Sequence, residues 1–133
     1  MAITYQIDHG RQRIFATASG AIGARDLFAY QMEIGSQPAL AGYDEIFDTS
    51  QVGSLLDINL DNLKKLAHLA GSTDRADKPS RFAIVATRDV YFGLGRMYES
   101  FRDCIPRTNR ELATFRSREE AEDWLDAKEA LQD

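Results

Sequence analysis

The sequence predicts an α/β domain in which helices pack on a mostly parallel sheet, and three observations predict it. Residues 82–86 are apolar at every position, which is the pattern of a central strand that is covered on both faces. Strand patterns and helix patterns alternate along the chain, as they do in parallel sheets with right-handed crossovers. Two alternating strands at the start add one antiparallel pair. The predicted order is therefore ββαβαβαβα.

The first three elements are a hairpin and a helix. Residues 3–7 alternate between apolar and polar, residues 8–10 are turn formers, and residues 14–19 alternate again. Beyond Gly20 and Gly23 the apolar residues recur at helical spacing on one face, at Leu27, Tyr30 and Ile34. Gly35 would end this helix.

The third strand is centred on residues 46–47 and is expected to end near Asp48. Asn59 can then cap a second helix, because its side-chain oxygen accepts a free backbone N–H of the first turn. The buried face of this helix is predicted to hold Leu63, Leu66, Ala67 and Ala70. Gly71 would end it, and the polar residues 72–80 form a loop.

A third helix follows the central strand, with Thr87 or Asp89 as its cap. Its core face is predicted to consist of Val90, Leu94, Met97 and Phe101. Residues 112–115 form the last strand. Residues 117–120 read Ser-Arg-Glu-Glu, a capping box that opens a final helix with Ala121, Trp124 and Leu125 facing inward.

Length and composition indicate a single domain spanning residues 1–133. The formal charge of −5 argues against a nucleic-acid partner, which would need a clustered basic face. Cys104 is the only cysteine, which suits a reducing compartment. No leader pattern and no apolar run of membrane-spanning length are seen, so we expect a cytoplasmic protein.

Several segments resemble the STAS-like (SpoIIAA-like) domains, the fold of bacterial anti-sigma-factor antagonists. Residues 46–52, Ile-Phe-Asp-Thr-Ser-Gln-Val, look like the third strand of that family. Residues 87–99 resemble the same stretch in an uncharacterised SpoIIAA-like branch that is also related to CRAL-TRIO lipid-transfer domains. With residues 4–8 and 120–125 the similarity covers nearly the whole chain. This resemblance implies one STAS-like domain. The relation of the SpoIIAA-like branch to lipid-transfer domains implies a carrier of small ligands.

One feature of the antagonists is missing. Their phosphorylated serine lies in an Asp-Ser-Ser-Gly turn at the start of the second helix, and the matching residues here are Asp57-Ile58-Asn59-Leu60. Phosphoserine adds about two negative charges at a helix N-terminus, and that charge is the switch. Because Ile58 cannot carry it, we expect no phosphoswitch of this kind.

An anion site is one candidate at the rim of the sheet. In open α/β sheets ligands bind beyond the carboxyl ends of the parallel strands, where helix N-termini favour anions. The residues predicted to line this rim are Asp48, Ser50, Arg88, Arg116 and Ser117. The alternative is that they are caps and solvated charges.

The third helix carries more aromatic surface than its core face needs. The surplus residues, with an arginine and a close-packing glycine among them, are Tyr91, Phe92, Gly95, Arg96 and Tyr98. Partner surfaces are enriched in aromatics and arginine, so this face is expected to be a dimer or partner interface, or the edge of a hydrophobic pocket. A wide core stripe is the simpler alternative.

No catalytic set, metal site or cofactor site is predicted. His9 and His68 have no spaced partners and are expected at the surface, and Cys104 is expected to be partly buried. The leading hypothesis is a non-catalytic regulatory or protein-interaction module that self-associates through the third helix. The second is a carrier or sensor of a lipophilic or anionic small molecule, and an enzyme is the third.

Overall fold

The structure is a computed structural model that describes residues 2–74, 78–106 and 109–132. One five-stranded sheet has the order β1-β2-β3-β4-β5, in which β1 pairs antiparallel with β2 and the other neighbours are parallel. The strands are β1 (Ile3–Asp8), β2 (Arg13–Gly23), β3 (Asp44–Leu56), β4 (Ser80–Val85) and β5 (Arg110–Phe115). The predicted element order and the initial hairpin are confirmed.

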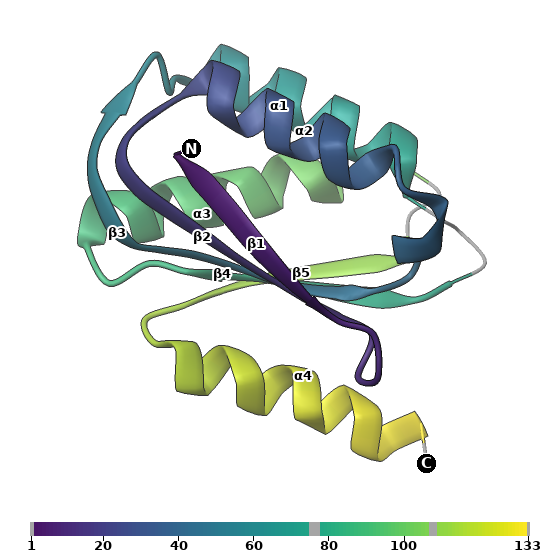
Figure 1. Cartoon of the computed structure of the whole chain (residues 1–133). Helices are drawn as coiled ribbons and strands as arrows, with labels where there is room; N and C mark the ends of the chain where they lie inside the picture. The colour runs from purple at the N-terminus through teal and green to yellow at the C-terminus, as the bar shows by residue number, and fades with distance from the viewer. Residues whose placement is uncertain (1, 75–77, 107–108, 133) are drawn as a thin grey trace.

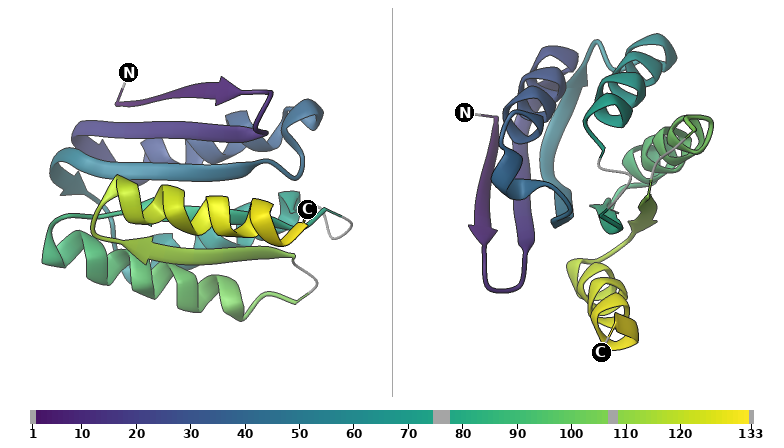
Figure 2. Two further views of the ribbon diagram at one scale, coloured as in Figure 1. Left: turned by 90° about the horizontal axis from the view of Figure 1, so that it is seen from below. Right: turned by 90° about the vertical axis from the view of Figure 1, so that its right-hand side faces the viewer.

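Helices cover both faces of the sheet, three on one side and one on the other (Figures 1 and 2). The helices are α1 (Ala24–Gly35), α2 (Leu60–Thr73), α3 (Asp89–Asp103) and α4 (Arg118–Gln132), with a short 3-10 turn η1 (Pro38–Leu40) after α1. Ala83 and Val85 of β4 pack with α4, whereas Ile84 packs with α2 and α3. The central position and double coverage predicted for residues 82–86 are confirmed.

The second and third strands are longer than the sequence predicts. Only residues 45–48 of β3 pair with β4, but its pairing with β2 continues to Leu56 opposite Gly23. The prediction that β3 ends near Asp48 is therefore wrong. Two register shifts interrupt this pairing, and Gly20 beside them has φ of +71°. Bulges bend a strand pair, and here the β2–β3 ribbon curves from the sheet up to the starts of α1 and α2 (Figure 1).

The predicted caps are confirmed for two helices and wrong for one. The Asn62 N–H donates to the Asn59 side chain at 2.8 Å, and the Glu120 N–H donates to the Ser117 hydroxyl at 3.2 Å. For α3 the cap position is Arg88, whose side chain makes no capping bond. Asp89 is instead the first helical residue and pairs with Arg116 at 2.7 Å.

The buried face of α3 also differs from the prediction. Val90 is 68% exposed, and the buried residues are Gly95, Tyr98 and Arg102. These lie three and four residues apart on one face, with Leu94, Met97 and Phe101 half-buried beside them. The helix thus turns its aromatic and small residues toward the sheet. The predicted stripe was assigned by hydrophobicity alone, and it started one position too early, at Val90 rather than Tyr91.

Candidate functional site

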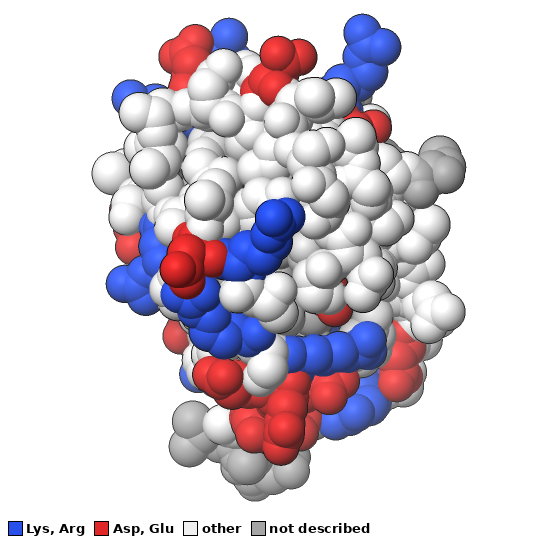
Figure 3. Space-filling view, turned by 90° about the vertical axis from the view of Figure 1, so that its left-hand side faces the viewer, with Lys and Arg blue, Asp and Glu red and all other residues white. Residues whose placement is uncertain are grey.

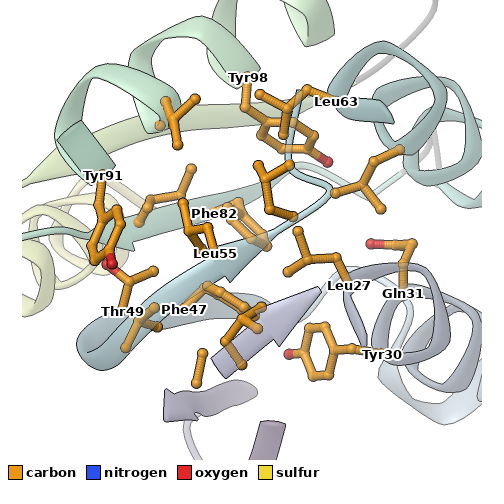
Figure 4. Close-up of a pocket in the computed structure, with 18 residues that line it drawn as sticks. Leu27, Tyr30, Gln31, Phe47, Thr49, Leu55, Leu63, Phe82, Tyr91 and Tyr98 are labelled. Atoms are coloured by element: carbon orange, nitrogen blue, oxygen red, sulfur yellow. The ribbon is translucent and has the colours of Figure 1, made fainter. Parts of the chain in front are cut away.

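An apolar cavity of about 120 Å³ lies between the sheet and the layer formed by α1, α2 and α3 (Figure 4). Its lining comes from β2, β3 and β4 of the sheet, from α1, α2 and α3, and from the turn before α2. The residues are Ala18, Ile22, Leu27, Tyr30, Gln31, Phe47, Thr49, Val52, Leu55, Ile58, Leu63, Leu66, Phe82, Ile84, Tyr91, Leu94, Gly95 and Tyr98. Leu55, Ile58 and Tyr91 are only half-buried, so the cavity reaches the surface near the β2–β3 ribbon.

Most of the polar groups in this lining already have protein partners. The Thr49 hydroxyl donates to the Val85 carbonyl at 2.7 Å, and the Tyr30 hydroxyl donates to Glu45 at 2.6 Å. The Gln31 amide donates to the Thr73 hydroxyl at 3.2 Å. What the cavity offers to a ligand is therefore chiefly hydrocarbon and aromatic surface, which favours apolar molecules.

The sequence builds this cavity through two local features. Gly95 allows α3 to approach β5 closely, since a Cβ at this position would lie 2.8 Å from Thr114. This contact brings Tyr91 and Tyr98 over the sheet. At the far end the curved ribbon supplies Ala18, Ile22, Val52 and Leu55, which close the space that a flat sheet would leave open.

A second cavity of about 230 Å³ adjoins the first toward the amino ends of the parallel strands. Its lining is far more polar. Glu45 accepts from the Arg110 guanidinium at 2.6 Å with its Oε1 and from Tyr30 with its Oε2. Arg110 also donates to the Ser80 hydroxyl at 2.7 Å and to the Tyr43 carbonyl at 2.9 Å. This network joins the starts of β3, β4 and β5 beneath α1.

A second buried ion pair lines the same cavity. Arg102 Nη2 lies 2.7 Å from Asp74 Oδ2, and the two side chains are 2% and 7% exposed. Arg102 Nε and Nη1 are buried and have no hydrogen-bond partner among the residues that the structure describes. Gly71 makes room for this guanidinium, because a Cβ there would lie 3.2 Å from Nη1.

The two tyrosines of this region are held in their neutral form. Burial is the main cause that raises the pKa of Tyr98 to about 12, with a further contribution from the nearby Glu45. Burial likewise raises the pKa of Tyr30 far above its ordinary value, and the adjacent Glu45 carboxylate adds to the effect. Both hydroxyls are hydrogen-bond donors at neutral pH.

The predicted rim residues make their contacts within the protein. Asp48 lies within β3 and accepts from the Ser50 N–H at 2.8 Å, and Ser117 caps α4. Arg116 pairs with Asp89 and stacks on Phe92, with 4.1 Å from guanidinium to ring centre. Arg88 lies over Tyr91 at 5.3 Å. Figure 3 shows this end of the molecule, where basic and acidic side chains lie next to each other. The alternative reading, caps and solvated charges, describes them better than an anion site.

The surplus residues of α3 divide into two groups. Tyr91, Gly95 and Tyr98 line the apolar cavity, whereas Arg96 is exposed and contributes nothing to it. Phe92 is half-buried under Arg116. Tyr98 is only 9% exposed and lines the apolar cavity, so its side chain is not part of an outer face. A carboxylate at this position would be buried in the core and would destabilise the fold.

The remaining single residues are at the surface. His68 is exposed, and exposed His9 has its Nδ1 at 2.9 Å from the Tyr43 hydroxyl. Cys104 is exposed rather than partly buried, because it follows the last turn of α3. Within the described ranges no three histidine, cysteine or acidic side chains gather as a metal site would require. None of the helices described there has the length and apolar character to cross a bilayer.

Comparison with known proteins finds similarity among solved structures but not among family models or curated proteins. No protein-family model matches the sequence, and no curated protein matches it. The crystal structure of an uncharacterised protein of the DUF3478 family from Shewanella loihica PV-4, which has a SpoIIAA-like fold, superimposes with a TM-score of 0.60. The alignment covers 93% of this chain and 94% of the other at 21% sequence identity. This chain has a SpoIIAA-like fold.

In this SpoIIAA-like fold the turn before α2 has a different use from the one in the antagonists. Asp57 adopts φ of +59°, Asn59 caps the helix, and Ile58 lines the apolar cavity. The residue at the position of the missing serine thus points its side chain inward. A phosphorylated residue would have to face solvent.

Sequence reasoning found three cavity residues and missed most of the others. It assigned Tyr91, Gly95 and Tyr98 to an interface or pocket, and these are the α3 part of the lining. The ribbon residues were missed because β3 was expected to end early. The polar residues Glu45, Arg102 and Arg110 were missed because each has a charged or polar neighbour in the sequence, as surface residues do, and no local pattern marks them as buried.

Proposed function

We propose that this domain is a non-catalytic module that binds a small lipophilic molecule between its sheet and the layer formed by α1, α2 and α3. The observation that carries the proposal is the apolar cavity of about 120 Å³. Native cores contain few voids larger than a water molecule, so a space of this size in a small domain calls for an occupant.

The volume indicates the size of the molecule. An engineered apolar cavity of about 150 Å³ stays dry and binds benzene. The cavity here, at about 120 Å³, suits an aromatic ring or a short alkyl chain. Its aromatic lining, with Phe47, Phe82 and Tyr91, can pack on either.

Ligand binding takes the place of self-association as our leading proposal. Two of the α3 aromatics on which the interface hypothesis depended, Tyr91 and Tyr98, are used inside the monomer. The large apolar side chains that stay exposed are spread over α1, α3 and the β3–α2 connection, namely Met32, Leu56, Leu60 and Val90. Scattered exposed apolar residues are normal on monomers. Self-association remains a prediction for a mass measurement.

A titration with toluene, followed by ¹H–¹⁵N NMR, tests the proposal. Toluene should shift the amide signals of residues around the cavity saturably, with a Kd in the millimolar range, about −4 kcal/mol at 1 mM. Leu55→Trp should abolish the shifts. The indole ring is larger than the leucine side chain and would extend from the β2–β3 ribbon into the cavity. Val90→Trp is the matched control, since Val90 is exposed and does not line the cavity.

The result is decisive in both directions. Equal saturable shifts in the wild-type protein and in Val90→Trp, with none in Leu55→Trp, support the proposal. Absence of saturable shifts in the wild-type protein, or unchanged shifts in a folded Leu55→Trp variant, would refute it.

A further inference from the structure

We infer that the ligand also carries a hydrogen-bond-accepting oxygen, a carbonyl or carboxyl group, which the Tyr98 hydroxyl and the Arg102 guanidinium bind where the two cavities meet. This inference rests on the proposed function. It adds the polar end of the ligand to the apolar end already described.

The apolar and the polar cavity are neighbours. Three residues, Gln31, Phe82 and Tyr98, line both of them. In Figure 4 Tyr98 and Gln31 lie on one side of the apolar cavity and Tyr91 and Thr49 on the other. The two volumes together fall in the range of about 300–1,000 Å³ that small-molecule pockets occupy. A ligand longer than the apolar cavity would therefore extend past Tyr98.

The Tyr98 hydroxyl differs in its hydrogen bonding from the other tyrosine hydroxyls. The chain has five tyrosines, and four of them have a hydrogen-bond partner: Tyr5 with Gln37, Tyr30 with Glu45, Tyr43 with His9, and Tyr91 with Arg88. Tyr98 is only 9% exposed, yet within the described part of the chain its hydroxyl has no such partner. Because Tyr98 lines both cavities, a ligand atom or a water can reach this hydroxyl and supply the partner that the described residues do not.

The Arg102 guanidinium lies one helical turn beyond Tyr98 on α3. Arg102 lies four residues after Tyr98 and therefore on the same face of the helix. Its Nη2 is held by Asp74 at 2.7 Å, and its Nε and Nη1 donate to no described residue. The groups that lack partners are thus the Tyr98 O–H and two nitrogen donors, which an oxygen acceptor satisfies and an ammonium group does not.

In the described part of the chain, the charged side chains that line the polar cavity are two of each sign. Asp74 pairs with Arg102, and Glu45 pairs with Arg110. The polar end must consequently supply acceptor atoms, which either a neutral carbonyl or a single carboxylate can do.

The experiment is an NMR titration with four probes: toluene, hexanoate, 2-heptanone and hexylamine. We expect hexanoate or 2-heptanone to bind at least tenfold more tightly than hexylamine, which has no acceptor in its ammonium form. Tyr98→Phe removes only the hydroxyl. This variant should bind hexanoate about tenfold more weakly, as expected for the loss of a hydrogen bond to a charged acceptor, or 2-heptanone about threefold more weakly, as expected for a neutral acceptor. Toluene binding should not change.

Two further variants separate the hydroxyl from its surroundings. Tyr91→Phe is the matched control, because Tyr91 also lines the apolar cavity but its hydroxyl accepts from Arg88 at 3.3 Å. It should leave the affinity for all four probes unchanged. Arg102→Lys keeps the charge beside Asp74 and removes the Nε and Nη donors. It should weaken the same oxygen-bearing probe that Tyr98→Phe weakens, with toluene as the check that the fold is intact.

The comparison between hexanoate and 2-heptanone decides whether the oxygen is a carboxylate or a carbonyl. If Tyr98→Phe binds both as tightly as the wild-type protein does, the hydroxyl serves only a water and the inference is overturned. Binding of hexylamine as tight as that of both hexanoate and 2-heptanone also overturns it. In both cases saturable toluene binding leaves the proposed function standing, whereas loss of toluene binding by the wild-type protein removes both.

Discussion

Replacing Gly95 with alanine should destabilise the domain although the same change at Gly93 should not. A Cβ on Gly95 would lie 2.8 Å from Cγ2 and 2.9 Å from Oγ1 of Thr114. Thr114 is buried and β-branched, so it cannot rotate away, and α3 must shift from the sheet. Overpacking of this kind costs about 1–3 kcal/mol. The higher helix propensity of alanine stabilises α3 by about 1 kcal/mol and offsets part of this cost. We expect a net loss of about 1 kcal/mol at Gly95.

Urea unfolding measures this loss. With a slope of about 2 kcal/mol per M, the midpoint of Gly95→Ala should fall by about 0.5 M. Gly93 is the control, since a Cβ there meets nothing within 4 Å and the variant should gain up to about 1 kcal/mol. In a Thr114→Ala background the loss at Gly95 should disappear, because both contacting atoms are gone. Equal midpoints for Gly95→Ala and Gly93→Ala would refute the close-approach argument.

Three further predictions concern a cap, a tyrosine and a surface pair. Asn59→Ala should lower the free energy of unfolding by about 1 kcal/mol in urea, because it removes the bond to the Asn62 N–H. The unfolded chain releases the Tyr98 proton near pH 10, whereas the folded chain holds it to about pH 12, so stability should fall between these values. Tyr98→Phe should make that fall shallower by about 1.4 kcal/mol per pH unit, and identical slopes would contradict the burial argument. Asp89→Ala should change stability by less than about 0.5 kcal/mol, since the two side chains of its pair with Arg116 are 93% and 46% exposed.

The layers of the fold could be predicted because several local signals agree. The apolar run at residues 82–86, the Asn59 cap and the Ser117 cap each specify one element, and all three were confirmed. The length of β3 could not be predicted in the same way. Residues 49–56 contain glycine and serine and look like a loop, but β2 pairs with them beyond two register shifts. Pairing between distant segments of the chain, which no local pattern reports, extends this strand.

The candidate site was only partly accessible from the sequence. The aromatic surplus on α3 indicated a functional face, but the pattern could not say whether that face is inside or outside. Gly95 decides it, because the close approach to Thr114 turns Tyr98 inward and leaves Val90 in solvent. The contribution of Glu45 and Arg110 depends on neighbouring strands bringing together residues 65 positions apart.

A crystal structure of the protein under xenon pressure tests the central claim most directly, because xenon occupies apolar cavities without needing polar contacts. We predict a xenon atom between the sheet and the helical layer, in contact with Phe47, Leu63 and Tyr98. A map in which side chains fill this space and no xenon binds there would contradict the account.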